Sequence, residues 1–122
     1  MFSIMLKSKL HNATVTGVEL EYEGSLAIDS DLMQAVRLLP FEKIMVANLA
    51  NGERFETYAI PAPAGSGTIC LNGATAHLGA VGDHLIIFAF GVVAQEELAS
   101  HRPLILVLDE KNRAPQGLRD IR

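Results

Sequence analysis

Glycine, proline and Asn-Gly pairs divide this chain into short apolar segments, and this punctuation constrains the fold more than any other feature. Asn51-Gly52 and Asn72-Gly73 are strong turn signals, because both residue types tolerate positive φ. The apolar runs between the breaks have strand length, and few of them show helical spacing. Such a chain favours a small closed β-barrel over an open sheet, because closure removes exposed edges.

The apolar pattern predicts six or seven short strands. Apolar residues alternate with glutamates over 18–23, which predicts a strand with one exposed face, and the unbroken apolar run 84–90 predicts a buried central strand. Residues 61–67 are rich in proline and glycine and are expected to form a loop, since neither residue sustains a central strand. The remaining strands are expected over 44–49, 54–60, 68–71 and 104–108.

One or two short helices are expected beside these strands. Asp29 or Ser30 can cap a helix whose apolar residues recur at helical spacing, and Pro40 would end it. A further turn or two of helix is expected within 95–100. From Asp109 onward the chain is polar and lacks periodicity, so we expect it to be loosely ordered there.

Size and charge exclude several classes of protein. With 122 residues and 13.2 kDa the chain has room for a single domain, 1–122, and is too short for a dinucleotide-binding domain plus a substrate domain. A net charge of −4 argues against nucleic-acid binding. Lysines interrupt the N-terminal apolar run, so neither a signal peptide nor a membrane span is expected. We expect a soluble, cytoplasmic protein with no membrane partner and a flexible tail over 114–122.

No metal site is expected from the sequence. The 4 histidines lack a metal-binding spacing. Cys70 is the only cysteine, which excludes an internal disulfide and a multi-cysteine metal site. Its apolar surroundings favour a packing role over that of a nucleophile.

The dipeptide Gly24-Ser25 stands where a predicted strand breaks, and it has a distinctive chemical capacity. A serine hydroxyl can attack the carbonyl of the preceding residue and displace the amide nitrogen, giving an ester, and glycine places no Cβ in the way. Elimination of the ester leaves dehydroalanine, which hydrolyses to a ketone. The chain would then carry a pyruvoyl group made from its own serine. Taken alone, the dipeptide is more typical of an ordinary turn.

Other candidate residues could bind an anionic substrate or transfer a proton. Arg54 and Lys9 could hold carboxylates, although surface charges of this kind are usually solvated. Thr57 and Tyr58 lie on one predicted strand and point to opposite faces; a tyrosine can donate a proton, but both residues also simply suit a strand. Asn72-Gly73-Ala74 could offer amide groups to an anion, or form a plain turn.

Several spaced motifs in one order are more specific than any of these residues. They are Met5-Leu-Lys-Ser-Lys9-Leu-His11, Tyr22-Glu-Gly-Ser25, Asn51-Gly-Glu-Arg54, Thr57-Tyr-Ala-Ile60 and Asn72-Gly-Ala74. With them, residues 3–113 resemble the bacterial L-aspartate 1-decarboxylase family, pyruvoyl-dependent enzymes that make β-alanine for pantothenate. The resemblance implies a double-psi β-barrel and a homotetramer with active sites between subunits.

The resemblance also implies how the cofactor arises. Self-cleavage between Gly24 and Ser25 would convert Ser25 into the pyruvoyl group, which forms a Schiff base with the substrate. Thr57 would support cleavage through a hydrogen bond at the Gly24 carbonyl. The enzyme would use neither metal nor pyridoxal phosphate, and an activator protein could assist its maturation.

The remaining roles concern the substrate, L-aspartate. Tyr58 matches the proton donor, and Arg54 and Lys9 match the groups that hold the carboxylates, with Thr57 beside them. The residues that would line the pocket or lie near it are Asn72, Gly73, Ala74, His11 and Tyr22.

The sequence departs from the family pattern at a few positions. Thr75 stands where alanine is usual, which is tolerable if that position acts through its backbone, and Ala47 replaces a larger residue, often Trp. Phe2 and the tail 114–122 match nothing in the pattern. Two alternatives stay open: a non-enzymatic β-barrel module for oligomerisation or ligand binding, and a pyruvoyl decarboxylase of another amino acid.

Overall fold

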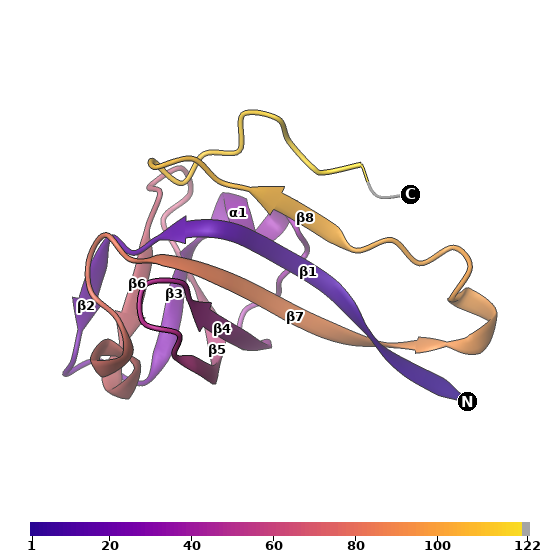
Figure 1. Cartoon of the computed structure of the whole chain (residues 1–122), viewed down its shortest axis with the longest axis horizontal. Coiled ribbons are helices and arrows are strands. Elements are labelled where there is room, and N and C mark those ends of the chain that lie inside the picture. The colour runs from indigo at the N-terminus through magenta and orange to yellow at the C-terminus, as the bar shows by residue number, and fades with distance from the viewer. Residues whose placement is uncertain (121–122) are drawn as a thin grey trace.

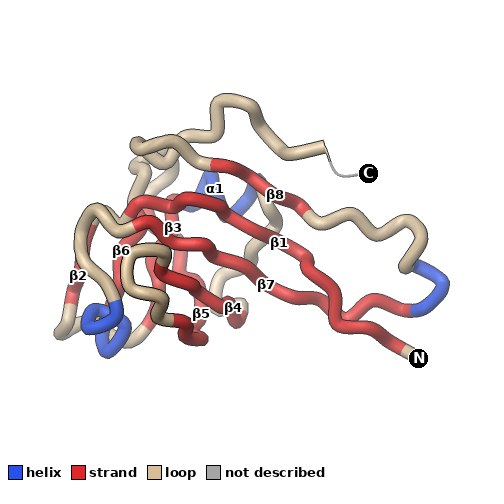
Figure 2. Tube along the Cα trace, in the orientation of Figure 1, coloured by secondary structure: helices blue, strands red, loops and turns tan. Residues whose placement is uncertain are grey.

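The computed structural model describes residues 1–120, and these form a mainly β domain (Figures 1 and 2). Within this range, one sheet of 8 strands has the order β2-β6-β3-β5-β4-β7-β1-β8. The strands are β1 (Phe2–Thr14), β2 (Gly17–Glu19), β3 (Ser25–Asp29), β4 (Lys43–Asn48), β5 (Arg54–Ala62), β6 (Ile69–Asn72), β7 (His84–Ala94) and β8 (Leu104–Val107). Short helices follow three of them: α1 (Ser30–Ala35), η1 (Gly73–Leu78) and η2 (Gln95–Glu97). The expected mainly β fold class is confirmed, with 8 strands in residues 1–120 instead of six or seven.

The sheet turns two corners, and this makes it compatible with the expected small barrel. The first half of β5 pairs with β4 and its second half, from Ala59, pairs with β3. At the other corner β1 runs through Val15 into β2. There Thr16 donates its backbone N–H to the Ile69 carbonyl of β6, and its hydroxyl accepts the Ile69 N–H at 2.9 Å.

The inner face of the curled sheet is aliphatic. Buried, mostly aliphatic residues alternate with less buried ones along β4 and the first part of β7, as the pleat requires. Each fully buried aliphatic side chain contributes about 1.5–3 kcal/mol relative to exposure. The largest fully buried apolar side chains are Leu10, Leu26, Ile28, Ile44, Ile69, Leu71, Leu85 and Ile87.

Several boundaries differ from the sequence prediction. The helix α1 is capped by Asp29 as expected, but it ends at Ala35 rather than Pro40 because Arg37 adopts a φ of 58°. Pro61 lies inside β5 instead of a loop; it pairs with β3, and the ladder to β4 has already ended at Tyr58. A proline is tolerated there because that edge of the strand needs no N–H donor.

The segment after β8 is held to the barrel, contrary to the expected loose order from Asp109. Asn112 is 1% exposed, and its side chain accepts the Thr14 N–H and donates to the carbonyls of Thr14 and Gly67. A single buried amide therefore holds this segment in place, although the segment lacks the apolar periodicity on which the prediction was based. Beyond it, the tail runs back along β8, where Leu118 bridges to Leu106 (Figure 1). Residues 121 and 122 lie outside the described residues.

The outer ends of β1 and β7 form a two-stranded arm that extends from the barrel (Figure 1). Its register places Ile4 opposite Val92, and these side chains are 75% and 70% exposed. Phe2 and Phe90 add further exposed apolar surface. Separately, none of the helices within residues 1–120 has the length and apolar character needed to cross a membrane.

Candidate active site

Ser25 begins β3 and is 1% exposed, so the candidate nucleophile is buried at a strand end. Its hydroxyl donates to the Glu23 carbonyl at 3.2 Å and accepts from Asn72 Nδ2 at 3.1 Å. A bond to the carbonyl two residues earlier folds the serine oxygen back over the Gly24 peptide. The hydroxyl therefore lies beside the bond that self-cleavage would break, in a chain that is still intact.

The register of the sheet places Asn72 beside Ser25. The two residues are direct partners in the antiparallel β3–β6 ladder, and β6 ends at Asn72. Cys70, two residues earlier, donates its S–H to Asn72 Oδ1 at 3.3 Å. This bond sets the orientation of the amide, so that its NH2 group faces Ser25. Burial, assisted by Glu19, raises the pKa of the Cys70 thiol, and the thiol therefore keeps the proton that it donates.

Gly73 makes room for the Gly24-Ser25 segment. It has a φ of 63°, and a Cβ at this position would lie 2.7 Å from both Cα and N of Gly24. The Tyr22 carbonyl oxygen would be only 2.8 Å away. Only glycine satisfies both the backbone angle and this approach. The Asn-Gly pair that predicted a turn thus also serves as the surface against which the cleavage segment packs.

Thr75 contacts both members of the Ser25–Asn72 pair. Its side chain is buried, and Oγ1 lies 2.7 Å from the Asn72 carbonyl oxygen and 3.4 Å from the Ser25 carbonyl oxygen. The sequence marked Thr75 only as a departure from the family. The contacts of Thr75 depend on the short helix η1, and the contact of Cys70 depends on the β3–β6 ladder. The residue pattern predicts neither feature.

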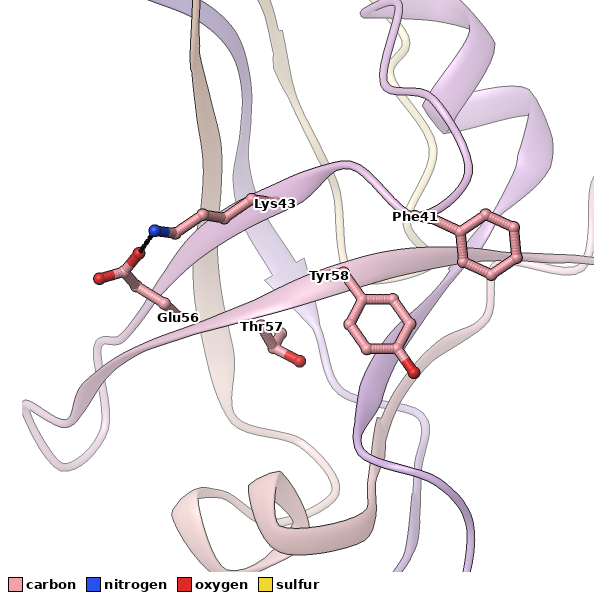
Figure 3. Close-up of a pocket in the computed structure, with 5 residues that line it drawn as sticks. All are labelled: Phe41, Lys43, Glu56, Thr57 and Tyr58. Atoms are coloured by element: carbon pink, nitrogen blue, oxygen red, sulfur yellow. Dashed lines mark ion pairs between the residues drawn. The ribbon is translucent and has the colours of Figure 1, made fainter.

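Thr57 and Tyr58 occupy the middle of β5, at the corner of the sheet. Tyr58 immediately precedes Ala59, whose partner Leu26 immediately follows Ser25, so Tyr58 and Ser25 stand at corresponding positions of neighbouring strands. Such strands run about 4.8 Å apart. An open pocket is lined by Phe41, Lys43, Glu56, Thr57 and Tyr58, with Lys43 and Glu56 ion-paired at 2.6 Å (Figure 3).

The candidate carboxylate-binding residues share the outer face of the sheet. His11, Ala47 and Arg54 belong to one row of cross-strand partners through Ile86, and Lys9 belongs to the next row. Directly opposed residues point to the same side of a sheet. Ile86 and the small Ala47 side chain therefore lie between His11 and Arg54 in this row.

The Arg54 guanidinium contacts an aromatic ring and a sulfur atom rather than a carboxylate. Its guanidinium lies 5.7 Å from the centre of the Phe88 ring, and Nη1 contacts the Met45 sulfur at 3.6 Å. Phe88 is the direct cross-strand partner of Lys9. Both cations thus flank one aromatic ring. Three other basic residues, Lys7, Lys43 and Arg113, are paired with carboxylates.

The surroundings of His11 favour its neutral form. Burial, with the positive charges of Lys9 and Arg119, lowers its pKa, and its Nδ1 is buried without a hydrogen-bond partner. A neutral imidazole can donate to a substrate carboxylate without adding charge. Among residues 1–120, no cluster of three or more histidine, cysteine or acidic side chains could hold a metal ion.

The predicted site residues therefore form three groups in one chain. Gly24, Ser25, Asn72 and Gly73 are in direct contact, Thr57 and Tyr58 lie on β5 just before it begins to pair with β3, and Lys9, His11 and Arg54 share the outer face. The exposed Tyr22 and Ala74 lie on segments that flank the first group. The structure shows no direct bond between the groups within residues 1–120.

Comparison with known proteins identifies the family. The family model described as aspartate decarboxylase matches residues 1–115. The aspartate 1-decarboxylase of Syntrophobacter fumaroxidans is 52% identical over 98% of this chain and 97% of its own length. Those of Thioalkalivibrio sulfidiphilus and Moorella thermoacetica are each 53% identical, over 99% and 93% of this chain and 96% and 88% of their own. A buried, hydrogen-bonded Ser25 and a match over nearly the whole chain agree: the chain belongs to the aspartate decarboxylase family.

Proposed function

We propose that this protein cuts its own chain between Gly24 and Ser25 and then decarboxylates L-aspartate to β-alanine and CO2, the step that supplies β-alanine for pantothenate. The observation that carries the proposal is the buried Ser25 hydroxyl, which donates a hydrogen bond to the Glu23 carbonyl and accepts one from Asn72. Membership of the aspartate decarboxylase family supports the substrate.

The cleavage step balances without an added reagent except water. Ser25 Oγ attacks the Gly24 carbonyl carbon, the Gly24–Ser25 amide bond breaks, and the amide nitrogen takes up the proton. Loss of the Ser25 Cα proton then breaks the Cβ–Oγ bond, so Oγ leaves with the new Gly24 carboxylate. Water hydrolyses the remaining dehydroalanine and releases ammonia. We assign to Thr57, on the strand beside β3, the support of this step through a hydrogen bond to the Gly24 carbonyl that would form during cleavage.

The residues around Ser25 fit a pyruvoyl group. Cleavage removes Ser25 Oγ, the acceptor of the Asn72 amide, so that the amide becomes available to a new carbonyl or to substrate. Gly73 leaves the space beside Gly24 free of side chains. When present, the group supplies an electrophilic carbonyl that accepts the electrons released with CO2.

The charged face selects and orients the substrate. Arg54 and Lys9, on either side of Phe88, hold the carboxylate that is retained in β-alanine, and the neutral His11 adds a donor beside them. A local pair of cations is needed because the chain as a whole carries a net charge of −4. Tyr58 donates a proton to the α-carbon in place of the CO2 that leaves.

Assembly brings the three groups together. We place the active site between subunits of a homotetramer, because the site groups are not in contact within one chain and the β1–β7 arm exposes a row of apolar side chains. Small soluble substrates and products, and a single cysteine, fit a cytoplasmic enzyme. We include an activator protein among the proposed partners, as an aid to maturation.

Denaturing mass spectrometry and a CO2 assay test the proposal together. We expect fragments 1–24 and 25–122, the larger one carrying a ketone at its start, and faster CO2 release from aspartate than from glutamate. Ser25→Ala should remain intact and inactive. Decarboxylation of aspartate by Ser25→Ala would disprove the cofactor assignment, and a preference for glutamate would disprove the substrate assignment.

A further inference from the structure

We infer that the Thr75 hydroxyl is a catalytic hydrogen-bond donor to the Ser25 carbonyl oxygen in the cleaved protein. The inference rests on the proposed function and adds a residue to it. Thr75 is 8% exposed, and its Oγ1 lies 3.4 Å from that oxygen in the intact chain.

One hydroxyl proton serves two acceptors here. A threonine carries a single O–H, and the short 2.7 Å contact assigns it to the Asn72 carbonyl in the intact chain. Rotation about the Cβ–Oγ bond is enough to direct the same proton to the Ser25 carbonyl oxygen. The hydroxyl can therefore donate to whichever of the two carbonyl oxygens becomes the stronger acceptor.

The reaction makes the Ser25 oxygen the stronger acceptor. The Ser25 carbonyl survives self-cleavage, and it adjoins the carbon that becomes electrophilic. Electrons released as CO2 departs spread onto this oxygen. Hydrogen bonds to an oxygen that gains negative charge are shorter and stronger than neutral ones. A buried donor already within reach thus stabilises the transition state more than the ground state.

The surrounding contacts keep Thr75 in place during this change. Its backbone belongs to η1, which begins at Gly73 directly after the strand that pairs with Ser25. The Asn72 side chain approaches Ser25 from the same segment. Donors from Asn72 and Thr75 therefore converge on residue 25, one at its side chain and one at its carbonyl.

Three variants separate the hydroxyl from the bulk of the side chain. Thr75→Val removes the O–H and keeps the shape, Thr75→Ser keeps the O–H, and Thr75→Ala restores the usual family residue if the valine chain folds poorly. Thr16→Val is the matched control, because it also removes the hydrogen bonds of a threonine hydroxyl. Those bonds are to Ile69 and do not involve Ser25. Turnover is measured per cleaved chain, which intact-mass analysis counts.

We expect Thr75→Val and Thr75→Ala to lower kcat about fivefold, as the loss of one neutral hydrogen bond does, with little change in KM. Thr75→Ser and Thr16→Val should keep kcat. A second readout is the carbonyl resonance of residue 25 in [1-¹³C]serine-labelled cleaved protein, which should move upfield in Thr75→Val and return in Thr75→Ser.

The outcomes distinguish this inference from the proposed function. An unchanged kcat and an unmoved carbonyl resonance in Thr75→Val would refute the inference while the cleaved wild-type enzyme still releases CO2. A wild-type chain that neither cleaves nor decarboxylates aspartate would refute the proposed function, and the role of Thr75 with it.

Discussion

Replacing Gly73 with alanine tests whether close packing of backbone against backbone places Ser25 for self-cleavage. The new Cβ would lie 2.7 Å from Cα and N of Gly24, and these are backbone atoms that cannot rotate away. Carbon atoms in favourable contact are about 3.5–4.0 Å apart, so the Gly24 segment must move by about 1 Å. The hydroxyl of Ser25 would then no longer lie over the Gly24 peptide.

Gly73→Ala should lower both the stability of the fold and the rate of self-cleavage, and the two effects can be measured separately. The φ of 63° at Gly73 costs a residue with a Cβ about 1–2 kcal/mol of stability, and the contact with Gly24 adds to it, for a total of about 2–4 kcal/mol. A displacement of about 1 Å at a reacting atom can slow a reaction about a hundredfold. We therefore expect Gly73→Ala to self-cleave about a hundred times more slowly than the wild type.

Gly52→Ala is the matched control, because Gly52 has a φ of 76° and an added Cβ would meet no atom within 4 Å. It should lose about 1–2 kcal/mol and cleave at the wild-type rate. Urea unfolding measures stability, and a mass-spectrometric time course measures cleavage. Wild-type cleavage by a folded Gly73→Ala chain would refute the reasoning, as would equal slowing in Gly52→Ala.

The other predictions concern charge and hydrogen bonds around the site. Arg54→Gln should lower kcat/KM for aspartate about tenfold or more, since charge-assisted hydrogen bonds are lost, without slowing cleavage. Cys70→Ala should slow cleavage about two- to fivefold and Cys70→Ser should not, because serine still donates to Asn72; equal rates in both variants would contradict this role. Burial alone would raise the pKa of Asp29, but hydrogen bonds from Gly67, Asp31 and Gly65 and the Arg113 charge outweigh it and hold the pKa below 3.8. That stabilisation is present at neutral pH and is lost as pH falls through the folded-state pKa. Asp29→Asn should therefore lose about 2–3 kcal/mol at pH 7 and show a flatter acid-unfolding curve, and an unchanged curve would contradict the assignment.

Local patterns predicted most of the strands because each side chain's preference agrees with its final environment. The run 84–90 became the first part of β7, but only Val18 and Glu19 of the predicted strand 18–23 lie in β2, because the chain turns at residues 20–23. β1 was not predicted, although it is the longest strand, because its register shifts near Lys7 and Asn12 break the alternation on which such a prediction depends. Asn112 was missed for a related reason: a buried polar side chain looks like surface until its partners are known.

The sequence alone determined which chemical groups this chain carries. Gly24-Ser25, Arg54, Thr57 and Tyr58 are chemical groups whose identity does not depend on the fold, and their order along the chain marks the family. Only the tertiary structure decided which groups meet. Ser25 meets Asn72 and Thr75 because two strands distant in sequence share one ladder, and Gly73 must be glycine because another backbone passes within van der Waals distance. Such contacts depend on strand register, a long-range property that no local run of residues carries.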